Sequence, residues 1–328
     1  MVQEVLKMAV THPESHEFKT LNQEKPTTAS GFTQFKFVDN YSNTVAQASI
    51  WTENLPRYGG YRKIAFVGGY SAGSHAHGLE LLHEVEEYAR SLGHDYLIGP
   101  VDGNTWSKYR FTTDGFDSPA FALESLTESA FPVHFKEAGF ESIAQYQSSI
   151  VETKQEFSPD EKALLERLSL AGISIRPFDC LNPELELDRL YEVSIKAFEK
   201  NFLYTPVDRM TFCNMYKPIL PLVDPELVLI AEDKDKKPVG FVFALPNKLL
   251  APGRDDTVVL KTLARVPGDR FKGLGLVLVS LCHKTAHQKG YKRMIHALYK
   301  NDNRSSCFSQ LSGAETIRQY ELFGKEIV

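Results

Sequence analysis

Arg270, Gly273 and Gly275 stand at the spacing Arg-x-x-Gly-x-Gly, between an apolar stretch of strand type and a segment of helical periodicity. Glycines let a ligand approach the backbone closely, and the first turn of a helix leaves N–H groups unpaired at its positive end. A phosphate or pyrophosphate fits such a place, and Arg270 and Lys272 add full positive charges. The spacing therefore predicts an anion-binding loop; the alternative is a glycine-containing turn with solvated basic residues.

Two common phosphate-binding motifs do not describe this loop. It has no Gly-Lys-Ser/Thr, so it is not a Walker loop, and it lacks the Gly-x-Gly-x-x-Gly of dinucleotide-binding folds. With Pro267 three residues before the arginine, the segment instead resembles the acetyl-coenzyme A signature of the GNAT superfamily of N-acetyltransferases. The resemblance covers most of residues 33–328.

This resemblance implies acetyl-CoA, or another acyl-CoA, as the cofactor. In that family the loop amides hold the pyrophosphate, and the preceding strand, here Leu263 to Val266, pairs its backbone with the pantetheine arm. The strand after the helix, here Lys292 to Leu298, splays away and opens a slot for the thioester. The cofactor-binding residues so implied are Leu263, Arg265, Val266, Arg270, Phe271, Lys272, Gly273, Leu274, Gly275 and Asn303.

The general acid of the family is missing from its usual place. Members often carry a tyrosine a few residues after an asparagine beyond the splayed strand, and this tyrosine protonates the leaving thiolate. The equivalent positions after Asn301 and Asn303 are Phe308 and Gln310. The predicted catalytic residues are therefore neighbours of that place: Tyr299, Asn301 and Ser306, with Ser305 and Cys307 beside them.

An internal repeat relates the two halves of the chain. Gly78 and Gly93 frame one predicted helix, and Gly275 and Gly290 frame another of equal length, 197 residues later. At that offset the following pairs correspond: Lys63 to Gly69 with Leu260 to Val266, Ile98 with Ile295, and Asn104 with Asn301. The predicted fold class is α/β, with two tandem GNAT-like lobes, each a mixed, mostly antiparallel, twisted sheet flanked by helices.

The predicted boundary between the lobes follows Val151, where the chain becomes polar and rich in turn-forming residues. Residues 1–155 form the N-terminal lobe with a degraded acyl-CoA loop, and residues 156–328 form the C-terminal lobe with the intact loop. Ser158-Pro-Asp-Glu161 has the form of a capping box and predicts a connecting helix that reaches Leu170.

Hydrophobic periodicity predicts the elements that position these motifs. The first thirty residues are polar and read as a loosely ordered arm. Strands are expected at 35–38, 45–51, 63–69, 95–98, 173–178, 227–231, 239–245, 258–266, 292–298 and 318–323, and helices at 79–92, 158–170, 184–198, 208–216 and 274–289.

In the first lobe the loop has lost its key residues, because Gly73 and Ala76 replace the arginine and the first glycine of the intact loop. His75 and His77 lie in this loop, but no carboxylate or third ligand stands at metal-binding spacing. Solvated histidines are therefore favoured, and no metal is predicted.

The first lobe also carries an insertion, since Asn104 to Gly139 spans 35 residues against 12 from Asn301 to Gly313. Its aromatic, basic and amide side chains are typical of a ligand pocket. The predicted substrate-binding residues are Asn104, Trp106, Tyr109 and Arg110, with Arg110 suited to a carboxylate or phosphate on the acceptor. The alternative is an Ω-loop whose aromatic residues hold it onto its own lobe.

The remaining histidine and cysteine patterns favour structural roles. His283 and His287 are four residues apart, but the glutamate of zinc proteases is missing, so a polar helix face is favoured. Four cysteines without a Cys-x-x-Cys pair predict reduced core thiols in a cytoplasmic protein.

The overall composition excludes several classes of protein. A net charge of −5 without a basic stripe argues against a nucleic-acid binder. No stretch approaches the roughly 20 apolar residues of a membrane span. The start of the sequence does not read as a secretion signal, because Glu4 and Lys7 interrupt its apolar run.

The resemblance to the GNAT superfamily implies an acyl-CoA-dependent N-acyltransferase with its site in the second lobe. Its acceptor would be the amine of a small molecule or peptide, acylated by direct transfer without a protein nucleophile. The alternative is a non-catalytic tandem protein that serves as a CoA-binding module or scaffold.

Overall fold

The computed structural model describes residues 22–23, 26–29, 31–60, 62–125, 127–247, 256–301 and 313–327. The strands are β1 (Asn22–Gln23), β2 (Thr27–Ala29), β3 (Phe32–Val38), β4 (Thr44–Trp51), β5 (Ile64–Ala72), β6 (Tyr96–Gly99), β7 (Phe111–Asp114), β8 (Glu141–Glu152), β9 (Ser174–Pro177), β10 (Val228–Glu232), β11 (Pro238–Pro246), β12 (Thr257–Arg265), β13 (Arg293–Lys300) and β14 (Glu315–Glu326). The α-helices are α1 (His75–Ser91), α2 (Ala130–Glu137), α3 (Pro159–Leu170), α4 (Pro183–Phe198), α5 (Arg209–Tyr216) and α6 (Leu274–Gln288).

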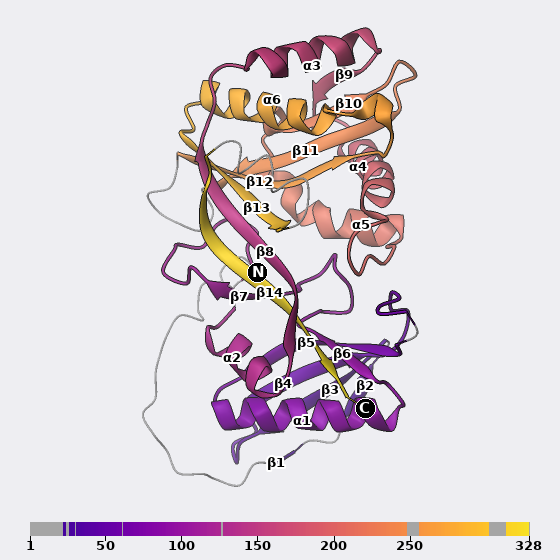
Figure 1. Cartoon of the computed structure of the whole chain (residues 1–328), viewed down its shortest axis with the longest axis vertical. Helices are drawn as coiled ribbons and strands as arrows, with labels where there is room; N and C mark the ends of the chain where they lie inside the picture. The colour runs from indigo at the N-terminus through magenta and orange to yellow at the C-terminus, as the bar shows by residue number, and fades with distance from the viewer. Residues whose placement is uncertain are drawn as a thin grey trace.

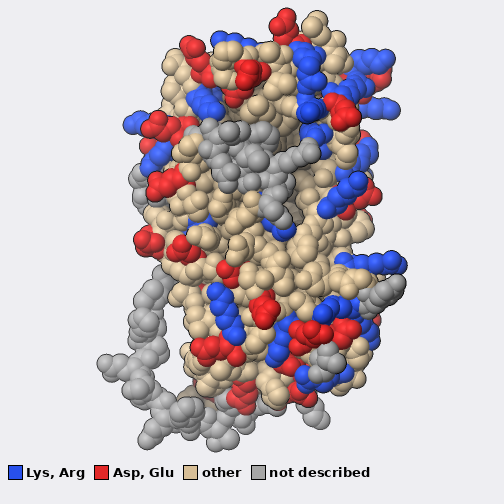
Figure 2. Space-filling view, in the orientation of Figure 1, with Lys and Arg blue, Asp and Glu red and all other residues tan. Residues whose placement is uncertain are grey.

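All these strands belong to one mixed, mostly antiparallel sheet, whose main order is β1-β3-β4-β5-β6-β14-β8-β13-β12-β11-β10-β9. The two remaining strands lie off this path, where β2 pairs with β3 and β7 pairs with β14. Helices α1 and α2 lie with the strands of the first half, and α3 to α6 flank the strands of the second half (Figure 1). The predicted fold class is therefore confirmed. On the face shown in Figure 2, acidic and basic side chains are interspersed, without a patch of one sign.

The first half follows its sequence signals closely. The hairpin between β3 and β4 turns at Asp39, whose carboxylate accepts the backbone N–H groups of Tyr41 and Asn43 at 2.8 and 2.9 Å. Helix α1 begins after Ser74, whose hydroxyl caps it, and Gly93 follows its end with a φ of +75°. The elements expected here are confirmed, and the predicted N-terminal arm lies mostly outside the described residues.

The second half places helices on both faces of its strands. Helix α3 has the expected capping box between Ser158 and Glu161 and packs with α6 on one face. Helices α4 and α5 cover the other face, where Phe212 and Leu187 are fully buried. Both faces of β10 and β11 are therefore buried, which explains their nearly continuous apolar sequences.

Two long strands tie the halves together. Strand β14, which ends the described chain, pairs with β6 and β7 of the first half and with β8. Strand β8, from the first half, lies between β14 and β13 (Figure 1). The boundary at residues 155 and 156 remains a prediction, and the strand pairing itself crosses between the halves. The region of the insertion contains β7 and α2, which the periodicity did not reveal.

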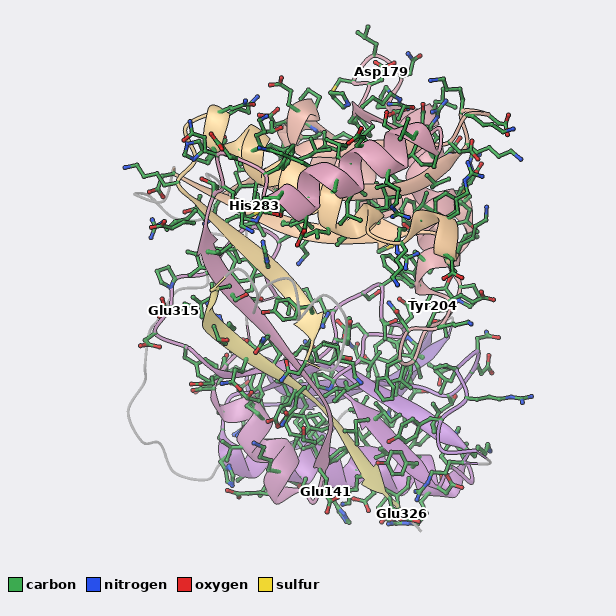
Figure 3. All side chains as sticks on the ribbon, turned by 45° about the horizontal axis from the view of Figure 1, so that its top comes forward. Glu141, Asp179, Tyr204, His283, Glu315 and Glu326 are labelled. Carbon is green, nitrogen blue, oxygen red and sulfur yellow. The ribbon has the colours of Figure 1, made fainter. Side chains whose placement is uncertain are left out.

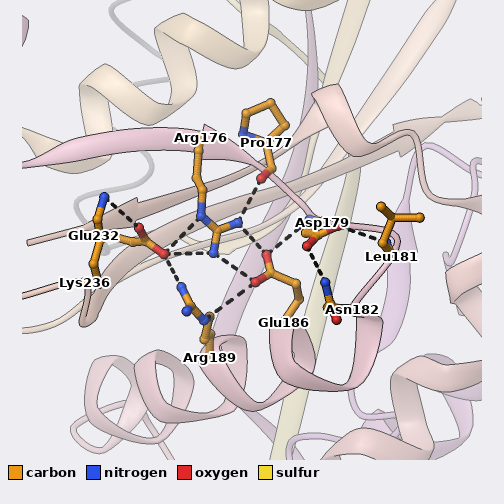
Figure 4. A network of polar contacts seen from close by, with 9 residues as sticks. All are labelled: Arg176, Pro177, Asp179, Leu181, Asn182, Glu186, Arg189, Glu232 and Lys236. Carbon is orange, nitrogen blue, oxygen red and sulfur yellow. Dashed lines mark hydrogen bonds and ion pairs between the residues drawn. The ribbon is translucent and has the colours of Figure 1, made fainter.

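Edge strand β9 is held by buried charges (Figure 4). Arg176 donates to Glu186 at 2.7 and 2.9 Å and to Glu232 at 3.0 and 2.8 Å, and Arg189 also pairs with both carboxylates. The Glu186 and Glu232 side chains are nearly inaccessible to solvent. Hydrogen bonds to these carboxylates, first of all to Glu186, raise the pKa of Arg176. The network thus joins β9, β10 and α4.

Two expectations about side chains need correction. Cys282 is buried as a core thiol, but Cys180 is exposed because it lies in the loop between β9 and α4; Cys307 lies outside the described residues. His283 does not lie on a polar helix face: it is 1% exposed and faces the sheet. Its place on α6 is labelled in Figure 3.

Candidate functional site

Strands β12 and β13 form a fork in the second half. They pair in parallel only from Thr257 with Arg293 to Leu260 with His296. Beyond this point β12 continues to Arg265 and β13 to Lys300, without further pairing between them. The edge of β12 that faces β13 therefore has no strand partner among the described residues after Leu260.

The loop that follows β12 leaves backbone donors open. Gly273 precedes α6 with a φ of +86°, and α6 has no side-chain cap. The first intrahelical bond runs from the Val277 N–H to the Gly273 carbonyl at 3.1 Å. The N–H groups of Leu274, Gly275 and Leu276 consequently have no acceptor in the part of the chain that the structure describes.

Neighbouring side chains brace this loop. Arg167 of α3 donates to the Lys272 carbonyl, and Arg265 donates to the Val266 carbonyl at 3.1 Å. Arg270 is half-exposed, and its nearest carboxylate oxygen is 4.0 Å away on Asp233. Its guanidinium is thus available to an anion at the loop.

A cavity of about 860 Å³ begins where β12 and β13 separate, after Leu260 and His296, and lies between the two halves. The cavity is lined by the insertion, by β12 and β13, by the segment between α4 and α5, and by Tyr146 of β8 and Tyr320 of β14. Figure 3 shows Tyr204 in the segment between α4 and α5, on the side that faces the first half. The lining residues from the fork are Leu260, Lys261, Thr262, Leu263, His296, Ala297, Leu298, Tyr299 and Lys300, with Val279 from α6.

Lys261 lies at the point where the fork opens. Its Nζ donates to the Leu123 carbonyl at 2.7 Å. Burial, and after it the charge of Arg110, lower the pKa of Lys261 to about 8, although Glu124 opposes the shift. A considerable fraction of this amine is therefore neutral in mildly alkaline solution.

Tyr299 offers a polar hydroxyl at the wall of the cavity. Its Oη is 2.8 Å from Ser149 Oγ and accepts a hydrogen bond from Gln147 Nε2 at 3.0 Å. Both partners lie on β8. The tyrosine side chain is 8% exposed, so its hydroxyl is held in one position beside the fork.

A buried pair of histidines lies behind the fork. His283 and His296 approach with their Nε2 atoms 3.0 Å apart. Burial lowers the pKa of His283 to about 3 and that of His296 to about 4. Both imidazoles are therefore neutral near pH 7, and His296 adds a neutral side chain to the cavity wall.

The structure brings part of the predicted site together. The following predicted residues line the cavity: Leu263, Tyr299, Trp106, Tyr109 and Arg110. Arg265, Val266 and the loop 270–275 lie toward the open end of the fork instead, two or more residues along the chain from Leu263, which is about 7 Å or more along a strand. Ser306 and Asn303 lie outside the described residues, as do Ser305, Cys307, Phe308 and Gln310.

The two predicted asparagines within the described chain do not line the cavity. The Asn104 side chain accepts the N–H groups of Trp106 and Ser107 at 2.9 and 3.2 Å and so shapes the turn of the insertion. The Asn301 N–H donates to the Gln145 carbonyl at 3.1 Å, and its side chain is exposed. Asn104 was predicted because it opens the insertion, and Asn301 because it follows the splayed strand.

The insertion reaches across to the second half. Trp106 Nε1 donates to the Thr205 carbonyl at 2.8 Å, and the indole ring contacts the rings of Phe198, Tyr204 and Phe212. The tryptophan therefore anchors the insertion on the opposite half rather than on its own, and it leaves Tyr109 and Arg110 at the cavity.

The equivalent fork in the first half is closed. Val101 N–H donates to the Val67 carbonyl at 2.8 Å, and Asp102 accepts the Gly69 N–H at 2.6 Å, so the edge of β5 is occupied. Tyr70 fills the space near Gly78, where a Cβ atom would lie 2.5 Å from the Tyr70 hydroxyl. Its aromatic partners there come from β7 and α2.

The fork of the first half also corrects the alignment of the repeat. Tyr96 pairs with Ile64, and Arg293 pairs with Thr257, so β6 and β13 differ by 197 residues while β5 and β12 differ by 193. The ungapped correspondence of 63–69 with 260–266 is therefore wrong by four residues. The cause is a strand-to-helix loop that is six residues longer in the second half, where it builds the turn before Gly273, and a helix that is two residues shorter.

Sequence reasoning missed several residues of the cavity, among them Lys261, Tyr146 and the segment Phe198–Tyr204. Lys261 was detectable as the charged residue inside an otherwise apolar stretch, Thr257 to Ala264. The other two reach the cavity through long-range packing, which no local pattern reports. Among the described residues, no group of three or more His, Cys, Asp or Glu side chains is placed so that it could hold a metal ion. No helix among them is long and apolar enough to cross a membrane.

Comparison with known proteins agrees with the fold. No family model matches the chain. Protein YghO of Escherichia coli is 25% identical over 75% of this chain and 70% of its own length, and a bacterial ceramide synthase of Caulobacter vibrioides is 21% identical over 51% of this chain and 43% of its own. A GCN5-related N-acetyltransferase from Sphaerobacter thermophilus superposes with a TM-score of 0.50 at 16% identity, over 90% of this chain and 80% of that one. The chain thus has the GNAT fold, and its two forks show the tandem form of that fold.

Proposed function

We propose that this protein is an acyl-CoA-dependent N-acyltransferase with one active site, at the fork of β12 and β13. The observation that carries the proposal is the fork itself. It has an unpaired strand edge, an uncapped helix start at its open end and a cavity at its closed end. The names of the relatives, a ceramide synthase and an N-acetyltransferase, support transfer to an amine.

Acyl-CoA binding follows from the order of these parts. The free N–H groups of Leu274 to Leu276 would hold the diphosphate, with Arg270 as its counter-charge. The edge of β12 from Lys261 to Arg265 would pair with the extended arm of the cofactor. The thioester would then reach the cavity, where a second substrate has room.

The chemistry needs an uncharged amine and a proton donor for the leaving thiolate. The amine attacks the thioester carbonyl, the C–S bond breaks, and the amine loses one proton while the thiolate gains one. Tyr299, whose hydroxyl lies at the wall of the cavity, would supply that proton. Holding both substrates in one cavity can supply about 7–11 kcal/mol of the barrier reduction, so no protein nucleophile is needed.

The first half would not bind the cofactor. The backbone edge that would accept the pantetheine is occupied by Val101 and Asp102, and Ser74 caps the start of α1. We therefore expect one CoA site per chain, and not the two that tandem forks would otherwise offer.

Calorimetric titration with CoA, followed by a thiol-release assay over a panel of amines, tests the proposal. Arg270→Ala should weaken CoA binding about tenfold, since one charge-assisted contact is lost. Arg57→Ala, which removes an exposed arginine of the first half, should leave it unchanged. A chain that binds CoA but releases no thiol with any amine would instead be the non-catalytic binding module. Unchanged affinity in Arg270→Ala would refute the assigned cofactor site.

A further inference from the structure

The described lining of the cavity carries charge of one sign only. Five basic residues line it, and aspartate and glutamate are missing from the described lining, although the whole chain carries a net charge of −5. These basic residues are Lys108, Arg110, Lys200, Lys261 and Lys300. They come from the insertion, from the segment after α4, and from both strands of the fork. Elements far apart in the sequence therefore converge to make one cationic site.

No carboxylate among the described residues neutralises the charge of Arg110. Its guanidinium stacks on the rings of Tyr109 and Tyr146, at 3.6 and 4.3 Å from their centres, and no carboxylate of the described residues lies within ion-pair distance. Its Nε donates to the Tyr109 carbonyl at 3.2 Å. Stacking holds the plane of the guanidinium and leaves its other N–H groups directed to a ligand.

Lys261 is likewise without an ion pair among the described residues, and its proton is held against the Leu123 carbonyl. The nearby carboxylate of Glu124 already binds two other side chains. It pairs with Arg318 Nε at 2.9 Å and accepts the Tyr320 hydroxyl at 2.7 Å. Buried positive charge without a partner is costly, so a cavity of this kind favours an anionic ligand.

We propose that the acceptor of the N-acyl transfer carries an anionic group, a carboxylate or a phosphate, in addition to its amine. This inference rests on the proposed function, because it assigns the second substrate of the same site. The diphosphate of the cofactor already has its own donors at the start of α6, at the open end of the fork. Arg110 and Lys261, which have no ion pair among the described residues, are therefore left for the acceptor.

The same charges fit the chemistry of the amine. A protonated amine is repelled by the cationic walls, which lower its pKa and favour the neutral nucleophile. The anionic group compensates for that repulsion and orients the molecule. Simple amines and polyamines, which lack such a group, are poor ligands for this cavity, whereas the many aromatic rings of the lining accept an apolar body.

Tryptophan fluorescence gives a readout that needs no turnover. The chain has two tryptophans, so Trp51→Phe leaves Trp106, which lines the cavity, as the reporter. This protein is saturated with CoA and titrated with four probes that share one ring: benzoate, phenyl phosphate, benzamide and benzylamine. We expect the two anions to bind at least about tenfold more tightly than the neutral and cationic probes, as one charge-assisted contact provides. The two anion arms distinguish a carboxylate from a phosphate.

Variants in the same background assign the preference to the cavity. Arg110→Gln should reduce the preference for the anion about tenfold, and Arg57→Gln should leave it intact. If Arg110→Gln fails to fold, Lys261→Gln provides the same test from the opposite wall. Equal binding of benzoate and benzamide, competition between benzoate and CoA, or a preference that survives both cavity variants would each overturn the inference. Anion preference without thiol release from any amine would refute N-acyl transfer and leave the anion site standing.

Discussion

Replacing Gly273 by alanine should separate cofactor binding from folding. Gly273 has a φ of +86° and connects the loop to α6, and an added Cβ would lie 2.8 Å from Leu164 Cδ2. An L-residue in the left-handed region costs about 1–2 kcal/mol. Moving the flexible end of Leu164 to another rotamer adds about 0.5–1.5 kcal/mol. The expected loss of stability is therefore about 1.5–3.5 kcal/mol.

The same change should weaken CoA binding, because the loop relieves the strain by moving the N–H groups of Leu274 and Gly275. Loss of one hydrogen bond to a charged group corresponds to about 1.5–3 kcal/mol. Because each tenfold change in the dissociation constant corresponds to about 1.4 kcal/mol, this constant should rise about tenfold or more. Calorimetry at a temperature where the variant is fully folded measures this rise, and urea unfolding measures the stability.

Gly290→Ala is the matched control at the other end of α6. Gly290 has a φ of +88°, and an added Cβ would meet nothing within 4 Å. It should cost about 1–2 kcal/mol of stability for the same backbone reason, with no change in CoA affinity. If the two variants bind CoA with equal affinity, whether unchanged or equally weakened, the N–H groups in the first turn of α6 are not the cofactor site.

Two further predictions concern buried charge. Glu186→Gln should lower stability by about 1–3 kcal/mol, because Arg176, which is about one-third exposed, loses one of its two carboxylate partners. Urea unfolding should show no comparable loss in Glu184→Gln, whose side chain is 81% exposed. Equal losses in the two variants would contradict the role of the network. The pKa of Lys261 falls from 10.5 to about 8 on folding, so between these pH values the unfolded chain binds more protons than the folded chain. Stability should therefore rise by about 3 kcal/mol as the pH increases across this window. Lys261→Met should lack the rise, and parallel pH profiles of the two proteins would refute the shifted pKa.

Local signals in the sequence predicted the anion loop and most elements. The capping box at Ser158 and the glycine that ends α1 fix helix limits through neighbouring residues alone, and both were found. The anion-binding role of the loop before α6 stays a prediction, and it could be made because the residues that suggest it lie within one short segment. Such features need no knowledge of what packs against them.

The cavity could not be predicted in the same way. Arg110 and Lys261 are 151 residues apart, and they share a site only because the insertion crosses to the second half. The pairing of β14 with β6 is equally non-local, since an apolar alternating strand fits any open edge. The occupied edge of β5 depends on two hydrogen bonds from Val101 and Asp102 that no residue pattern announces.

The pairing of β8 and β14 across the two halves has a consequence for biosynthesis. The first half leaves the ribosome with a gap between β6 and β8, which only residues 315–326 can fill. The fork of the second half likewise depends on β8, which buttresses β13 from the side opposite β12. Neither half can therefore complete its sheet during synthesis, and the protein reaches its native state only after β14 has been translated. Activity and stability should accordingly appear together, once β14 has been translated.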